Sequence, residues 1–157
     1  MFDESKETKN FLIYSDGGSR GNPGNAAYGW LLFSVIGLES FDAKYIGIAS
    51  NNSAEYQGIY NAIKAFKTYV SKEKNIETSI LTCYLDSELI VKQLLGEYKV
   101  KDQGLKIWYK KIIKLQNELK DSGIATKFVH VRREKNKHAD RLVNICLDII
   151  ELQNEKN

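Results

Sequence analysis

The chain has little of several residue types that often carry structure or function. Its 157 residues include two cysteines and two histidines, and neither cysteine lies in a Cys-x-x-Cys spacing. Two cysteines are too few for a disulfide framework, and a chain of this length folds without one. No apolar run approaches the roughly 18 residues that a membrane span requires. These absences argue against a zinc finger, a disulfide-rich secreted protein and a membrane protein.

Proline and one-sided charge are also scarce. The single proline, Pro23, lies in a turn-rich segment, and 23 basic against 20 acidic residues give a formal net charge of +3. This charge permits a nucleic-acid partner without requiring one. The first ten residues are polar and of mixed charge, unlike a signal peptide. We expect one domain over residues 1–157 with its core at about 10–153. We also expect a cytoplasmic monomer that has no membrane contact and needs no protein partner.

Hydrophobic periodicity predicts secondary structure in the order βββαβααβα. Strands are expected at about 10–14, 28–35, 41–49, 80–85 and 126–131, and helices at about 52–70, 87–95, 103–119 and 136–153. Three successive strands with short links favour an antiparallel meander, whereas strands separated by helices favour parallel pairing. The predicted fold class is α/β: a mixed five-stranded sheet flanked by helices.

Four carboxylates stand at the predicted ends of elements. Asp16 closes the first strand before two glycines, and Asp86 closes the fourth strand. Glu55 and Asp140 lie in the first turns of the first and last helices. If the first and fourth strands are parallel neighbours, Asp16 and Asp86 project from adjacent carboxyl ends, where open α/β sheets bind ligands.

Each acid also has a structural interpretation. Asp16 is suited to start a turn, Glu55 to close a capping box with Asn52, Asp86 to cap the next helix, and Asp140 to balance a helix dipole. Taken together, however, four like charges at one sheet edge raise one another's pKa or require a cation between them. Magnesium, which prefers oxygen ligands, is the natural candidate.

Four motifs together resemble type 1 ribonuclease H. They are YSDGGSRGNPG at 14–24, SNNSAE at 50–55, YLDSELIV at 84–91 and HVRREKNKHADRL at 130–142. They stand in the family's order and at family-like spacing, and the resemblance covers about 11–150. It implies a ribonuclease H fold and cleavage of the RNA strand in RNA–DNA hybrids, leaving 5′-phosphate and 3′-hydroxyl ends.

The resemblance also implies a set of site residues. In the family, four acids hold two magnesium ions, with manganese as an alternative, against the scissile phosphate. At the matching positions here, the catalytic and metal-binding residues are Asp16, Glu55, Asp86 and Asp140. Two such ions stabilise the attacking and the leaving oxygen of the displacement.

Discrimination of RNA from DNA requires contacts to the 2′-hydroxyl. The resemblance assigns these contacts to backbone atoms at Gly17 and Gly18, to Glu55, and to the side chains of Asn22, Asn51 and Asn52. Helix capping is an alternative for Asn51 and Asn52. Ser50 matches a position that holds a phosphate of the DNA strand.

The sequence departs from better-known members of the family in two places. Residues 96–102 stand where many members carry a long basic insertion, so the chain resembles a short form and we expect salt-sensitive activity. The loop before the last acid, residues 132–137, lacks the family's histidine. Accessory roles are open to His138, to Arg132 and to Arg133, whereas His130 is expected as a structural residue of the fifth strand.

Three other functions remain open to a sequence of this kind. They are a hybrid-binding module whose catalysis has lapsed, another nuclease on the same sheet architecture, and the nuclease domain of a retroelement-type polymerase. The complete set of acids disfavours the first, and the Gly-Asn-Pro-Gly and Asn-Asn motifs disfavour the second. Both cysteines are expected as buried free thiols, and both tryptophans as packing residues.

Overall fold

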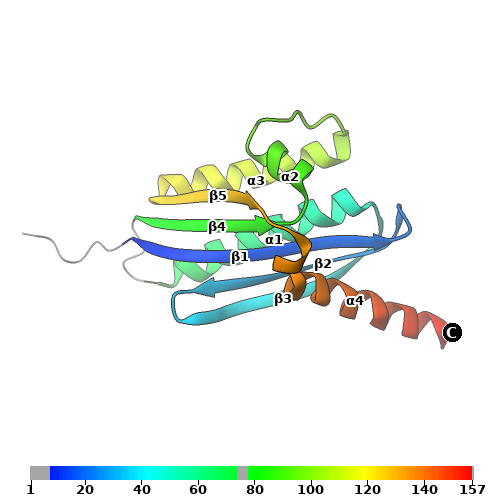
Figure 1. Ribbon diagram of the computed structural model, residues 1–157. Helices are drawn as coiled ribbons and strands as arrows, with labels where there is room; N and C mark the ends of the chain where they lie inside the picture. The colour runs from blue at the N-terminus through cyan, green and yellow to red at the C-terminus, as the bar shows by residue number, and fades with distance from the viewer. Residues whose placement is uncertain (1–7, 74–77, 157) are drawn as a thin grey trace, which may run out of the picture.

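The computed structural model describes residues 8–73 and 78–156 and contains one mixed five-stranded sheet (Figure 1). The polar residues expected before the first strand lie mostly outside this range. The strands are β1 (Lys9–Arg20), β2 (Gly24–Ser34), β3 (Gly37–Ala49), β4 (Ser79–Leu85) and β5 (Ile124–His130), in the spatial order β3-β2-β1-β4-β5. β1, β2 and β3 pair antiparallel, whereas β4 pairs parallel with both β1 and β5. The predicted meander and the predicted parallel strands are both confirmed.

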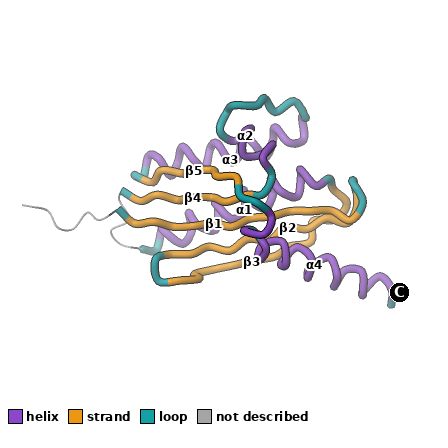
Figure 2. The backbone as a smooth tube through the Cα atoms, viewed as in Figure 1, coloured by secondary structure: helices purple, strands orange, loops and turns teal. Residues whose placement is uncertain are grey.

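Within the described residues, four α-helices cover the sheet unevenly (Figure 2). Their bounds are α1 (Asn51–Ser71), α2 (Glu88–Leu94), α3 (Gln103–Asp121) and α4 (Lys137–Glu155), and a 3-10 turn, η1 (Arg133–Lys135), was not predicted. α1 packs on β1 and β2 and α3 on β5, behind the sheet in Figure 1, whereas α4 packs on β1, β2 and β3 from the front. Among the described helices, none is long and apolar enough to cross a membrane.

The main core lies between the sheet and α1. The apolar residues that predicted this helix, Ala54, Ile59, Ala62, Ile63, Phe66 and Val70, are all buried. Trp30 is buried too, and Trp108 of α3 packs against the ring of Tyr60, with their centroids 5.4 Å apart. Both tryptophans are therefore packing residues, as predicted.

The apolar sequence of residues 80–85 predicts a strand covered on both faces, but the front face of the sheet is only partly covered. Leu81, Cys83 and Leu85 are buried, but Thr82 and Tyr84 on the other face are half-buried. A small second core of Ala27, Val143 and Leu147 lies under α4. The helical spacing of the apolar residues in 136–153 predicts that Ile149 points inward, which is wrong, because Ile149 is 49% exposed. Cys146, expected to be buried, is only partly so.

The first strand is longer than predicted. The Asp-Gly-Gly sequence predicted a strand end at Asp16, but β1 continues to Arg20 because β2 pairs with it as far as Arg20 and Asn25. Asp16 therefore lies inside a strand, opposite Gly29. The other expected boundaries lie within four residues of those observed.

Candidate active site

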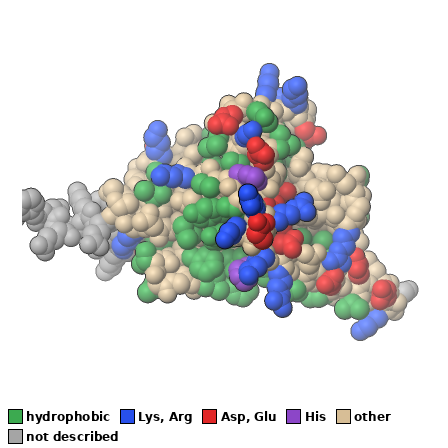
Figure 3. Space-filling model, viewed as in Figure 1, with side chains coloured by type: hydrophobic (Ala, Val, Ile, Leu, Met, Phe, Trp, Pro, Cys, Tyr) green, Lys and Arg blue, Asp and Glu red, His purple; other side chains and the backbone are tan. Residues whose placement is uncertain are grey.

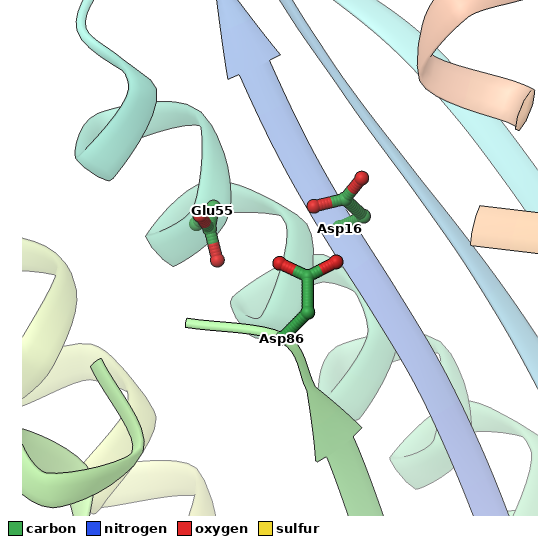
Figure 4. Close-up of side chains that lie close together, drawn as sticks. All are labelled: Asp16, Glu55 and Asp86. Carbon is green, nitrogen blue, oxygen red and sulfur yellow. The ribbon is translucent and has the colours of Figure 1, made fainter. Parts of the chain in front are cut away.

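Three carboxylates from separate segments meet beside the end of β4. Tyr14 of β1 and Tyr84 of β4 are paired in parallel register, so Asp16 and Asp86, each two residues further on, come side by side. Glu55 reaches the same point from the second turn of α1, and the three side chains point toward one another (Figure 4). One oxygen of each carboxylate lies within 4.8 Å of the others.

Local structure at the start of α1 leaves Glu55 free for this site. The Ser50 Oγ accepts a hydrogen bond from the Ser53 N–H at 3.1 Å and caps the helix, so the capping role considered for Glu55 is wrong. Gly17 allows the helix to lie against β1, because a Cβ there would be 2.3 Å from the Ala54 carbonyl carbon. Gly17 is thus needed for the close approach of α1 to β1.

Asp140 completes the site from the opposite face of the sheet. It lies in the first turn of α4 and, with Asp16, Glu55 and Asp86, lines a cavity of about 270 Å³. Two features fix α4 there. Gly29 admits it closely, since a Cβ would lie 2.6 Å from the Leu142 Cβ. Arg20 forms ion pairs with Asp148 at 2.6 Å and Glu151 at 2.7 Å.

Asn136 belongs to this site, and sequence reasoning did not select it as a site residue. Its side chain is buried, and its Nδ2 donates to the Ser15 carbonyl oxygen at 2.9 Å and to Asp86 Oδ2 at 3.2 Å. It also precedes α4, and its carbonyl accepts the Asp140 N–H at 3.1 Å. One residue therefore connects β1, Asp86 and the helix that carries Asp140. The sequence feature that could have indicated Asn136 is its position four residues before Asp140.

Without a cation, burial and mutual repulsion disfavour the ionised forms of Asp16 and Glu55. Burial, followed by the charges of Asp86 and Asp140, raises the pKa of Asp16 to about 8. Burial and the nearby Asp16 and Asp86 raise the pKa of Glu55 well above its ordinary value. The Glu55 Oε2 is buried with no hydrogen-bond partner. Oxygen ligands, excess negative charge and this unsatisfied atom all fit a divalent cation.

Of the arginine and histidine side chains considered for the site, only Arg133 lines the acidic cavity. Arg133 of η1 lines the acidic cavity, and its charge acts to lower the pKa of Glu55. Arg132 is exposed and lies 4.0 Å from Glu134, and His138 lines a different cavity on the open face of the sheet. His130 lies on β5 as expected, and its side chain is exposed.

The predicted substrate contacts also differ in their placement. Gly17, Gly18 and Asn51 line the acidic cavity, whereas Asn22, Ser50 and Asn52 are not among its lining residues. The Asn51 Oδ1 accepts from the Ser19 N–H at 2.8 Å, which ties α1 to β1. The Asn22 Oδ1 accepts from the Asn51 N–H at 3.1 Å. These residues therefore also order the turn and the helix start.

Comparisons with known proteins agree with this geometry. Residues 14–146 match the family described as Reverse transcriptase-like. The chain is 35% identical to ribonuclease HI of Halobacterium salinarum over 136 residues, which cover 86% of this chain and 63% of the relative. Other relatives, from mycobacteria, are 36% identical, and the chain spans 35% of their length.

Solved structures show the same fold. The ribonuclease H domain of a Mycobacterium tuberculosis protein is 30% identical, with a TM-score of 0.80, over 93% of this chain and 99% of that one. A ribonuclease H1 isolated from compost, solved in complex with an RNA/DNA hybrid, is 37% identical, with a TM-score of 0.78, over 89% of this chain and 98% of that one. With this identity over nearly the whole of these domains, the chain belongs to the type 1 ribonuclease H family.

Proposed function

We propose that the chain is a metal-dependent endoribonuclease that hydrolyses the RNA strand of RNA–DNA hybrids and leaves 5′-phosphate and 3′-hydroxyl ends. The observation that carries this proposal is the convergence of Asp16, Glu55 and Asp86 within 4.8 Å, with Asp140 in the same cavity. A hybrid-bound relative supports the choice of substrate.

Asp16, Glu55, Asp86 and Asp140 would hold two magnesium ions, with manganese as an alternative. When bound, such ions stabilise charge on the attacking and leaving oxygens of a phosphodiester displacement. The protein buries Asp16 and Glu55, so their negative charges are poorly solvated, and a bound cation would supply the compensating charge. Arg133 at the cavity wall supplies a positive charge for a substrate phosphate.

Recognition of the 2′-hydroxyl is proposed for the residues beside these acids. Gly17, Gly18 and Asn51 line the cavity, so their polar atoms are placed to meet an RNA strand held there. Asn22 and Asn52 would extend this contact along the minor groove, and Ser50 would meet the DNA strand at the start of α1.

The proposal is tested by incubating a labelled hybrid, an RNA duplex and a DNA duplex with magnesium, followed by analysis of the product ends. The wild-type chain should cleave the hybrid. Asp16→Asn and Asp86→Asn should abolish cleavage and leave hybrid binding measurable. Asp121→Asn, which changes an exposed acid at the end of α3, is the matched control and should cleave normally. Cleavage by Asp16→Asn at a near wild-type rate would refute the assignment.

A hybrid-binding module whose catalysis has lapsed predicts a different result. It would bind the hybrid without cleaving it, and magnesium would not raise its thermal stability. Under the proposed function, magnesium should stabilise the metal-free protein, because the ion binds only the assembled acids. The monomeric state and the cytoplasmic location remain predictions, and sedimentation analysis would test the first of them.

A further inference from the structure

The open front face of the sheet carries an apolar surface that the proposed reaction does not use. Cross-strand pairs place Leu12 beside Phe33 and Tyr14 beside both Leu31 and Tyr84, so these side chains share one face. All five are half-buried. Hydrophobic side chains gather on this face beside the charged cluster (Figure 3).

A cavity of about 550 Å³ lies in this surface, which we call the sheet-face pocket. Leu12, Tyr14, Leu31 and Phe33 form its apolar floor. The Tyr14 ring lies edge-on to Phe33, with their centroids 6.0 Å apart, and stacks on Tyr84 at 4.8 Å. Concave sites of this size, lined by aromatic side chains with a few polar groups, are typical of ligand pockets.

The rim of the pocket is mainly cationic. Lys135, Lys137 and His138 line one side, with Glu134 as the single acid among the lining residues. Lys127 of β5 pairs with Thr82, which places it on the same open face. The pocket therefore combines an apolar, aromatic floor with positive charge, and its chemical complement is a flat apolar group joined to an anion.

We propose that the sheet-face pocket binds single-stranded nucleic acid, with a base against Tyr14 and Phe33 and the adjoining phosphates at Lys135 and Lys137. Each nucleotide of a single strand offers an unpaired base beside a phosphate. Aromatic side chains and cationic grooves bind such strands with little dependence on sequence.

One short segment lies between the pocket and the acidic site. Asn136 lines the pocket, and its Nδ2 contacts Asp86. Arg133, three residues earlier, lines the acidic cavity. A single strand that leaves a hybrid in the acidic cavity would cross this segment to reach the pocket. This link to the hybrid rests on the proposed function, whereas binding of a free single strand does not.

The test measures fluorescence anisotropy of a short labelled oligothymidylate with metal-free protein. Phe33→Ala should weaken binding about tenfold through lost stacking. The paired change Lys135→Glu with Lys137→Glu should weaken it at least as much and flatten its salt dependence, because about two phosphate contacts are lost. Phe41→Ala, an exposed change on the same face but outside the pocket, should bind normally. So should Lys72→Glu with Lys120→Glu, which makes the same charge change just after α1 and on α3.

Each outcome decides for or against the proposal. Failure of the wild-type protein to bind the oligonucleotide overturns it, as does equal binding by the pocket variants. Concentration-dependent self-association that only Phe33→Ala abolishes would instead make the face a protein interface. If Phe33→Ala does not fold, the paired lysine variant decides alone, because both lysines are exposed. Cleavage of a blunt-ended hybrid is measured in parallel, so that failure of the proposed function is seen separately.

Discussion

The buried Asn136 shows how one side chain holds a carboxylate in position. It donates to Asp86 and to the carbonyl of Ser15, so its loss leaves Asp86 free to turn away. Groups that orient metal ligands typically contribute 10–100-fold to metal affinity or activity. We therefore predict that Asn136→Ala lowers kcat for hybrid cleavage about tenfold and raises the magnesium concentration needed for half-maximal rate. Asn136→Asp should be worse, because it sets a like charge against Asp86.

The magnesium titration separates positioning from general destabilisation, since a merely less stable protein would keep its metal affinity. Asn117→Ala, an exposed asparagine on α3, is the control and should leave both kinetic values unchanged. A wild-type magnesium requirement in Asn136→Ala would show that Asp86 needs no such support.

Asp16 gives a prediction on pH and stability. In the folded, metal-free chain its pKa is about 8, above the ordinary value of about 3.9 for an unfolded chain. The folded state therefore holds the proton more tightly, and the free energy of unfolding should fall as pH rises from about 4 to about 8. Asp16→Asn removes this charge and should be more stable than wild type at pH 9 by about 2 kcal/mol.

Urea unfolding in the presence of a chelator, at pH 6 and at pH 9, measures this effect. The advantage of Asp16→Asn should be larger at pH 9 and should shrink when magnesium is added to the wild type. Asp121→Asn should show no such pattern. An equal difference at both pH values would mean that Asp16 is not the group that titrates.

The sequence could predict the four acids, but not all of their neighbours. Carboxylates at element ends, read with the motifs around them, identify Asp16, Glu55, Asp86 and Asp140. The contacts of Asn136 depend on three segments meeting in space, which no local pattern records. His138 precedes Asp140 by two residues, and two residues of helix turn the chain by about 200°, so His138 faces the sheet-face pocket instead.

At the scale of elements, strand pairing overrides local turn signals. Asp16-Gly17-Gly18 is a strong turn sequence, yet β2 pairs with β1 through this stretch and keeps it extended. The two glycines differ in what surrounds them. A Cβ on Gly17 would meet α1 backbone atoms at 2.3 to 2.5 Å, whereas one on Gly18 would lie 3.7 Å from the nearest atom, Val143 Cγ1.

We predict that Gly17→Ala destabilises the protein by about 2–3 kcal/mol, because backbone on both sides must shift. The shift moves α1 away from β1, so Glu55 should leave the acidic cluster and magnesium should stabilise the variant less. Gly18→Ala serves as the matched control for stability and should unfold within about 0.5 kcal/mol of wild type. Thermal unfolding with and without magnesium measures both effects. Equal stability of the two variants would contradict the close packing at Gly17.

At the scale of the whole molecule, the sheet separates a packed back from a partly open front. The strands and helices could be predicted because the spacing of apolar residues along the chain is a local property. Their order then predicted a mixed sheet flanked by helices. How far α4 covers the front depends on Gly29 and on the ion pairs of Arg20, which act between distant segments. The open face could therefore not be predicted from β4, whose apolar sequence indicated burial on both sides.

The distribution of charge predicts how the molecule holds a hybrid. The connection between α2 and α3 is short, and exposed positive charge remains there on Lys99 and Lys101 and on Lys110 of α3. Surface lysines bind phosphates by displacing counterions, so affinity falls steeply with salt. If these three lysines each contact one phosphate, a fourfold rise in salt should lower kcat/KM about fortyfold.

Replacement of Lys99, Lys101 and Lys110 by glutamine tests this directly. The triple variant should cleave more slowly at low salt and lose most of its salt dependence, while kcat at saturating hybrid stays near the wild-type value. Lys64→Gln on α1 with Lys72→Gln just after this helix, behind the sheet, should keep the wild-type slope. Because all of these side chains lie outside the acidic cavity, a change in KM without a change in kcat would show that they hold the hybrid and take no part in its cleavage. A wild-type rate that stays flat from low to high salt would mean that the short connection makes no phosphate contacts.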